Sequence, residues 1–183
     1  MKYEIAKRLV DKYNNQWRFY HVHKHSMRVM HFASLICDEL NIKGWEKKKI
    51  EIAAKYHDIG KLSYTKGMLS EKRKFTQNEI KLAKKHAEFG YKIIKAFHKN
   101  ESIAEIVKYH HEKLDGSGYP DGLTDKDISL SVKIITVCDA YDAMFRHYSK
   151  KTKEEAFKEL KKNSGTQFDK DVVDALLRME DEI

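Results

Sequence analysis

A polar pair interrupts an apolar helical pattern in the stretch Tyr56-His57-Asp58-Ile59-Gly60-Lys61. His57 continues the apolar stripe of Ile50 and Ala53, at the spacing of one face of a helix. Its imidazole should therefore point into the core, where a polar side chain without a partner costs several kcal/mol. Asp58 follows directly, so the two neighbouring side chains can reach two points of one buried site.

Four further histidines and a second aspartate lie on or beside apolar helical stripes in the same way: His25, His86, His110, His111 and Asp139. One such histidine is usually a hydrogen-bonded core residue, but this alternative weakens when five histidines and two aspartates behave alike. Imidazoles and carboxylates that converge in a helical core are best satisfied by metal ions. Two ions about 3.5–4 Å apart, bridged by an aspartate, suit the hydrolysis of a phosphoester.

Helix-forming residues fill most of the 183-residue chain, which has a single proline and no alternating, strand-like run. We therefore predict an all-α fold in one domain, residues 1–183, with a short helical N-terminal extension over about residues 1–20. Thr76 with Glu79, and Thr152 with Glu155, have the spacing of capping boxes. The predicted helices cover residues 3–13, 22–41, 45–58, 76–84, 86–98, 101–111, 129–147, 152–163 and 169–180.

The charge pattern and the cysteines indicate a cytoplasmic protein. The chain carries a formal charge of +8 but no long, uncharged apolar run of the kind found in membrane spans and signal peptides. Cys37 and Cys138 fall within apolar helical patterns, so we expect buried, reduced thiols. The positive charge is compatible with an anionic partner, although most lysines have the spacing of solvated helix faces. We expect no membrane partner and no nucleic acid polymer.

Longer motifs extend this picture. Residues 56–61 resemble the signature of the HD family of metal-dependent phosphohydrolases. Residues 110–123, HHEKLDGSGYPDGL, resemble the longer and more specific signature of its HD-GYP subfamily. The resemblance runs from about His25 to the C-terminus and includes two later motifs, Asp139-Ala140-Tyr141-Asp142-Ala143-Met144 and Gly165-Thr166-Gln167-Phe168-Asp169.

The resemblance implies a single-domain helical HD-type phosphohydrolase fold, with a centre of two or three divalent ions in the core, commonly iron or manganese. It implies that cyclic di-GMP is opened to the linear dinucleotide pGpG, in some members onward to GMP. Asp58 and Lys61 would be catalytic, with Asp58 bridging two ions and Lys61 meeting the scissile phosphate. The implied metal ligands are His25, His57, Asp58, His86, His110, His111 and Asp139.

Substrate binding is assigned on the same basis to Lys61, Lys113, Asp115, Gly118, Tyr119, Pro120, Arg146 and Lys150. Three departures from the family pattern bear on this assignment. Members with three metals place a glutamate one turn before the first histidine, where this chain has His21 as an extra candidate ligand. Residues 145–150 replace a tract resembling Arg-Pro-Tyr-Arg, and residues 69–73 replace a turn resembling Lys-Pro-Gly.

Other functions stay open at this point. The substrate could be the hybrid cyclic GMP–AMP dinucleotide, or the chain could be a non-catalytic module that binds a cyclic dinucleotide or a protein. A general HD nucleotidase for mononucleotides is a further alternative, against which the long glycine-rich signature argues. About twenty residues precede His21, too few for a sensor domain. We therefore expect regulation by a protein partner, by assembly into a homodimer or by the oxidation state of the metal.

Overall fold

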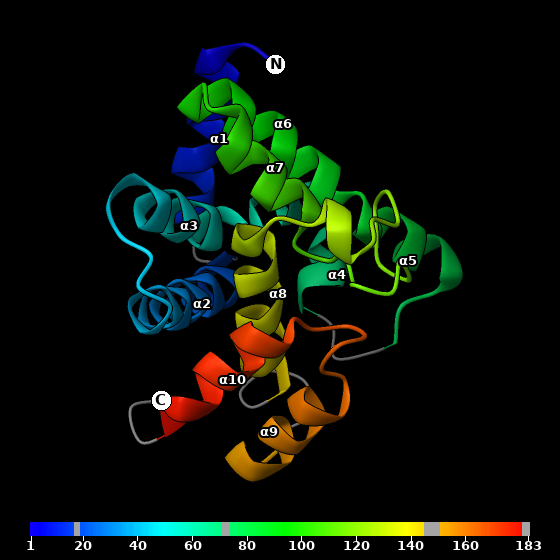
Figure 1. Cartoon of the computed structure of the whole chain (residues 1–183). Helices are drawn as coiled ribbons and strands as arrows, with labels where there is room; N and C mark the ends of the chain where they lie inside the picture. The colour runs from blue at the N-terminus through cyan, green and yellow to red at the C-terminus, as the bar shows by residue number, and fades with distance from the viewer. Residues whose placement is uncertain (17–18, 71–73, 145–150, 181–183) are drawn as a thin grey trace.

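The computed structural model describes residues 1–16, 19–70, 74–144 and 151–180. Within these ranges the chain forms helices joined by turns and loops, without any β-strand, so the predicted all-α class is confirmed (Figure 1). Two short 3-10 helices, η2 (Ile59–Ser63) and η3 (Asp125–Asp127), interrupt the α-helical succession. The α-helices are α1 (Tyr3–Asn15), α2 (Tyr20–Glu39), α3 (Gly44–Tyr56), α4 (Lys66–Ser70), α5 (Gln77–Lys84), α6 (His86–His98), α7 (Glu101–Tyr109), α8 (Leu130–Asp142), α9 (Lys153–Lys162) and α10 (Lys170–Arg178).

The nine predicted helices are all present, and both predicted capping boxes form, at the start of α5 and of α9. Four predicted helices, over 22–41, 45–58, 101–111 and 169–180, end two residues earlier, at Glu39, Tyr56, Tyr109 and Arg178. The short elements η2, α4 and η3 lie in stretches that were expected to be loops. Helices of three to five residues are too short to produce a recognisable helical periodicity in the sequence. Residues 145–147, expected to continue the helix from 129, are outside the described part of the chain.

The core is built around α2 and α8, which pack against each other and against α10, while α3 packs along α2. The predicted stripe of α2 is buried, with Val29, Phe32 and Ile36 facing inwards. Cys37 and Cys138 are fully buried free thiols, as predicted. In Figure 1, α8 runs through the middle, with α6 and α7 near one of its ends and α9 and α10 near the other.

The N-terminal helix α1 belongs to this core. Ala6, Val10 and Tyr13 are buried, and the Tyr13 hydroxyl lies 2.9 Å from Ser26 Oγ on α2, next to His25. The segment expected as an extension therefore supports the helix that carries the first predicted ligand. None of the helices in the described ranges combines the length and the apolar content that crossing a membrane would require.

Two glycines allow η2 to lie directly against α6. A Cβ atom on Gly60 would be 1.8 Å from the carbonyl oxygen of His86 and 2.8 Å from the backbone nitrogen of Gly90. Gly90 in turn lies close to Val107 of α7, with 2.9 Å between its ideal Cβ position and Cγ1. Because neither glycine has a side chain, the backbone after Asp58 can approach the start of α6.

The glycine-rich loop that follows α7 is tied to the C-terminal part of the chain. The backbone N–H of Asp115 donates to the Thr166 carbonyl over 2.9 Å. Lys133 of α8 then joins two carboxylates, with Nζ 2.5 Å from Asp125 and 3.1 Å from Asp169. The loop is consequently held between α8 and the turn that precedes α10.

Candidate metal centre

Three of the predicted ligands are histidines at helix ends, and each is fixed in the same way. The last carbonyl groups of a helix lack partners within the helix, so a nearby N–H can satisfy them. Each histidine donates Nδ1–H to the carbonyl three residues earlier, over 2.7 Å in every case: His57 to Ala54, His86 to Ala83 and His110 to Val107. This geometry assigns the Nδ1–H tautomer and leaves a lone pair on each Nε2 atom.

The Nε2 atoms of these histidines turn towards a common point. Those of His86 and His110 lie only 3.3 Å apart, with two lone pairs facing each other. Nε2 of His57 is buried and has no hydrogen-bond partner among the described residues. Buried nitrogens in this arrangement need a cation between them, and a first-row divalent metal ion fits such a donor set.

Two carboxylates complete the cluster. Asp58, which is buried, places Oδ1 3.5 Å from Nε2 of His86 and Oδ2 3.5 Å from Nε2 of His57. Asp139 on α8 places Oδ1 2.8 Å from Nε2 of His25 and Oδ2 3.9 Å from Nδ1 of His111. The two aspartates therefore lie between histidines from different helices.

These atoms form three overlapping groups, in each of which the candidate ligand atoms lie within 4.8 Å of one another. One group brings together Asp58, His86, His110 and His111. The others are His25 with His57 and Asp58, and His57 with His110 and Asp139. Asp58 is common to the first two groups, which is the position that a bridging carboxylate would need. The structure thus gathers all seven residues predicted as metal ligands.

The protonation states also suit metal binding. Burial lowers the pKa of His86 to about 4 and holds that of His110 well below its usual value, so both imidazoles are neutral at neutral pH. Burial alone would raise the pKa of Asp58, but the Lys61 ammonium, 2.6 Å away, and His57 hold it well below its ordinary value. Neutral imidazoles and ionised carboxylates are the forms that bind metal ions.

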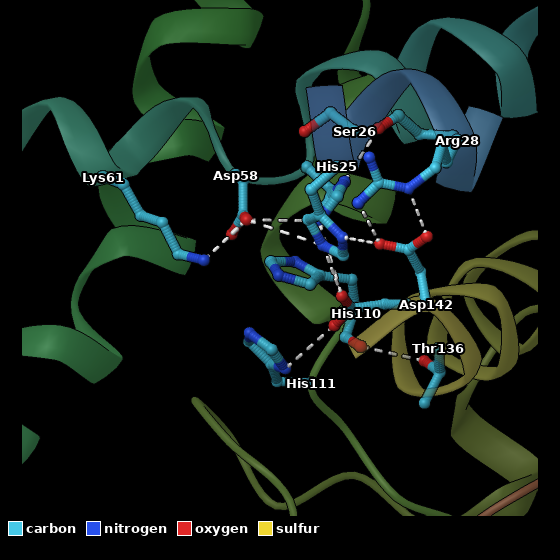
Figure 2. A network of polar contacts seen from close by, with 12 residues as sticks. His25, Ser26, Arg28, Asp58, Lys61, His110, His111, Thr136 and Asp142 are labelled. Carbon is cyan, nitrogen blue, oxygen red and sulfur yellow. Dashed lines mark hydrogen bonds and ion pairs between the residues drawn. The ribbon is translucent and has the colours of Figure 1, made fainter. Parts of the chain in front are cut away.

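His25 has a different environment from the other histidines. Its Nδ1 lies 2.6 Å from Asp142 Oδ2 (Figure 2). Its Nε2 lies 2.8 Å from Asp139. Burial works against the charged imidazole, but the hydrogen bonds to Asp139 and Asp142 outweigh it and raise the pKa of His25 to about 9. Without metal, His25 is accordingly a protonated group between two carboxylates.

The lowered histidine pKa values predict that the metal-free protein loses stability in acid. A histidine whose pKa is 6.5 unfolded and about 4 folded stabilises the fold fully above pH 6.5, and this contribution is lost as the pH falls towards 4. From pH 7 to 4.5, His86 alone should lower the free energy of unfolding by roughly 2 kcal/mol.

Urea unfolding of chelator-treated protein at several pH values measures this loss. His25 acts weakly in the opposite direction within this window, because its raised pKa gives stability that is complete only below pH 6.5 and is lost towards pH 9. Ionised Asp58 contributes only below about pH 4, near the ordinary carboxyl pKa. Equal free energies of unfolding at pH 7 and 4.5 would contradict the prediction.

The glycine-rich loop is organised by Glu112, a residue that sequence reasoning missed. Its buried carboxylate accepts hydrogen bonds from the backbone N–H groups of Asp121, Gly122 and Leu123, over 2.7, 3.1 and 3.1 Å. A signal was available, because an acidic residue directly follows the histidine pair and precedes three glycines. Within the folded loop, the Tyr119 ring stacks on His111 with centroids 4.7 Å apart.

The other predicted substrate-binding residues differ in their placement. Lys61 lies at the centre, on Asp58, whereas Asp115 is exposed and accepts hydrogen bonds from Ser117 within its own turn. His21 is exposed, with its ring against Tyr20, and belongs to none of the three ligand groups.

Three further residues predicted to bind substrate lie in the glycine-rich loop, at or before its Gly118-Tyr119-Pro120 turn. Lys113 and Pro120 are half-buried, and Gly118 packs against the backbone of Glu112, 2.5 Å from its ideal Cβ position to Cα. Arg146 and Lys150 fall outside the described residues. The same holds for residues 71–73 of the tract 69–73, which replaces the turn resembling Lys-Pro-Gly.

Known proteins share both the sequence pattern and the fold. The HD domain family matches residues 16–172. A cyclic di-GMP phosphodiesterase of Thermotoga maritima is 36% identical over 176 residues, which are 92% of this chain and 47% of that protein. The 3'3'-cGAMP-specific phosphodiesterase 3 of Vibrio cholerae is 36% identical over 120 residues, 66% of this chain and 26% of that protein.

Among solved structures, the HDG"Y"P protein Bd1817 of Bdellovibrio bacteriovorus has the same fold, with a TM-score of 0.74 and 20% identity. The match covers 95% of this chain and 57% of that one. The chain spans about half the length of the Thermotoga relative, at 47%.

A helical core that collects histidines and aspartates around a His-Asp pair defines the class of HD domains. The chain belongs to the HD domain family and, by the signature over residues 110–123, to its HD-GYP group.

Proposed function

We propose that this chain is a metal-dependent phosphodiesterase that hydrolyses cyclic di-GMP to the linear dinucleotide pGpG. The observation that carries this proposal is that two ligand groups share Asp58, with the Lys61 ammonium 2.6 Å from its carboxylate. Two divalent ions at these positions, iron or manganese, would supply an activated water and neutralise charge on a phosphodiester.

The side chains of the site position the ions and the substrate. One position is formed by His25, His57, Asp58 and Asp139, and the other by Asp58, His86, His110 and His111. Lys61 neutralises Asp58 in the described structure and keeps 22% of its side chain exposed. It can therefore turn towards the scissile phosphate, where an ammonium stabilises the charge that develops.

The glycine-rich loop forms the wall of the site beside His111. Tyr119 presents its ring there, and Gly118 and Pro120 set the turn that carries it. Lys113 adds a positive charge near this wall that suits a substrate with two phosphates. Arg146 and Lys150, assigned to substrate binding from the sequence, lie outside the described residues.

The names of the relatives support this class of substrate. A second candidate is the hybrid dinucleotide, because the relative from Vibrio cholerae named for 3'3'-cGAMP matches 66% of the chain at 36% identity. Both compounds present a phosphodiester within a dinucleotide ring, so the metal centre does not distinguish them. Contacts with the bases would have to do so.

The test is an assay of anaerobically purified protein loaded with Fe(II) or Mn(II), with metal per chain measured on the same sample. We expect two ions per chain and the appearance of pGpG by chromatography, with chelator-treated protein inactive. Competition between the two dinucleotides then ranks the substrates. Failure to cleave either dinucleotide in protein that has bound both ions would overturn the proposed activity.

A further inference from the structure

The four innermost histidines are held in two different ways. His57, His86 and His110 each donate Nδ1–H to a neutral backbone carbonyl. His25 instead meets the carboxylate of Asp142, with 2.6 Å between Nδ1 and Oδ2. An acidic partner makes an imidazole a stronger donor to a metal ion than a carbonyl does, and it also fixes the ring and its tautomer.

Asp142 is itself clamped from the other side. Arg28 donates from Nε to Oδ1 over 2.6 Å and from Nη2 to Oδ2 over 2.8 Å, a two-pronged ion pair. Asp142 is completely buried on α8, and Arg28 lies one helical turn after His25 on α2. Figure 2 shows the carboxylate between the guanidinium and the imidazole, with Asp58 and Lys61 beyond His25.

We propose that Asp142, clamped by Arg28, is a positioning residue that keeps His25 in the Nδ1–H form with Nε2 aimed at the metal position it shares with His57 and Asp58. This inference rests on the proposed metal centre. Asp142 would therefore control the metal affinity of the position formed by His25, His57 and Asp58, although it contacts only His25 of the candidate ligands. The metal affinity of the second position, formed by Asp58, His86, His110 and His111, should not depend on Asp142.

The guanidinium makes an asparagine at position 142 informative. Arg28 has only donors and donates to both oxygens of Asp142, so an asparagine, with one oxygen, sets its NH₂ group against an Arg28 donor in either orientation. With the amide oxygen towards Nε of Arg28, the NH₂ group faces Nδ1 of His25 and favours the opposite tautomer, in which Nε2 carries the proton and has no lone pair for a metal ion. With the oxygen towards His25, the neutral amide accepts from Nδ1–H more weakly than the carboxylate does. Removing the guanidinium as well frees the amide oxygen to accept from Nδ1–H again.

The experiment is a Mn(II) titration of metal-free protein, followed by calorimetry and by electron paramagnetic resonance. Wild type should bind two ions. Asp142→Asn should weaken one site about 10–100-fold and leave the other unchanged. The double variant Arg28→Met/Asp142→Asn should regain part of the lost affinity, which a merely damaged fold would not do. Asp38→Asn, which removes an exposed carboxylate of α2 paired with Lys47 of α3, is the matched control.

Nitrogen-15 spectra of the histidines in Zn(II)-loaded protein provide a second readout, because Zn(II) is diamagnetic. They should show His25 protonated on Nδ1 in wild type and in the double variant. Wild type that binds no divalent ion would refute the metal centre itself. Two ions bound with unchanged affinity by Asp142→Asn, or wild-type His25 protonated on Nε2, would refute only the role of Asp142.

Discussion

An Asp58→Asn variant should lose cyclic dinucleotide hydrolysis by at least roughly 10³-fold while it remains folded. Asp58 is the residue common to two ligand groups, and its two oxygens face different histidines, His57 and His86. An amide is neutral and offers one oxygen, so it cannot bridge two cations. Lys61 loses its ion pair with Asp58 but is already partly exposed, which lets its ammonium move towards water.

Three measurements on the same protein check this prediction: hydrolysis of cyclic di-GMP, metal per chain and the cooperativity of urea unfolding. His57→Ala should also abolish hydrolysis, because it removes a ligand whose Nε2 has no other hydrogen-bond partner in the described structure. Asp38→Asn, an exposed acidic control, should keep both activity and metal. Full activity in Asp58→Asn and His57→Ala would rule out the proposed site.

The helices and the clustered residues of the candidate site could be predicted because the burial of both follows from periodicity. The apolar stripe of α2 places His25 on the same face as Val29 and Phe32, and the structure buries all three. Periodicity places a side chain on a face of its own helix but does not say what it meets there. We predicted that several such faces converge on one point from two other observations. These were the family resemblance and the unusual number of histidines on apolar helical stripes.

The sequence did not reveal the residues that hold the candidate ligands and the glycine-rich loop in place. Asp142 lies 114 residues after Arg28 and 117 after His25, and no local pattern connects positions so far apart. Glu112 binds backbone N–H groups of a loop, and these donors exist at almost every position of any sequence. Such contacts depend on how the elements pack.

At two histidines of the candidate site, the predicted helix runs two residues beyond the observed one for a related reason. The patterns over 45–58 and 101–111 continue through His57 and His110, but α3 ends at Tyr56 and α7 at Tyr109. Each histidine side chain caps a terminal carbonyl, that of Ala54 or of Val107. The apolar pattern continues across this boundary, since the capping imidazole is buried as well.

Replacing Gly60 by alanine should cost at least about 3 kcal/mol of stability, because the new methyl group has no space. Its carbon would lie 1.8 Å from the carbonyl oxygen of His86 and 2.8 Å from the backbone nitrogen of Gly90. Both atoms belong to the backbone of α6, so no flexible side chain can move aside. Either η2 or α6 must shift, and the 3.5 Å contact between Asp58 and His86 would open.

Thermal and urea unfolding of metal-free protein measure the loss, which should lower the midpoint of thermal unfolding by roughly 6–12 °C. Gly165→Ala is the matched control, because Gly165 has open space around its Cβ position and only a positive φ of 80°. Strain of that kind costs about 1 kcal/mol, so the control separates backbone conformation from collision. If the two variants were equally stable, η2 and α6 would not be in the close contact that places Asp58 beside His86. A larger loss at Gly60 would show that the fold requires a glycine there, because only then can η2 lie against α6 and place Asp58 beside His86.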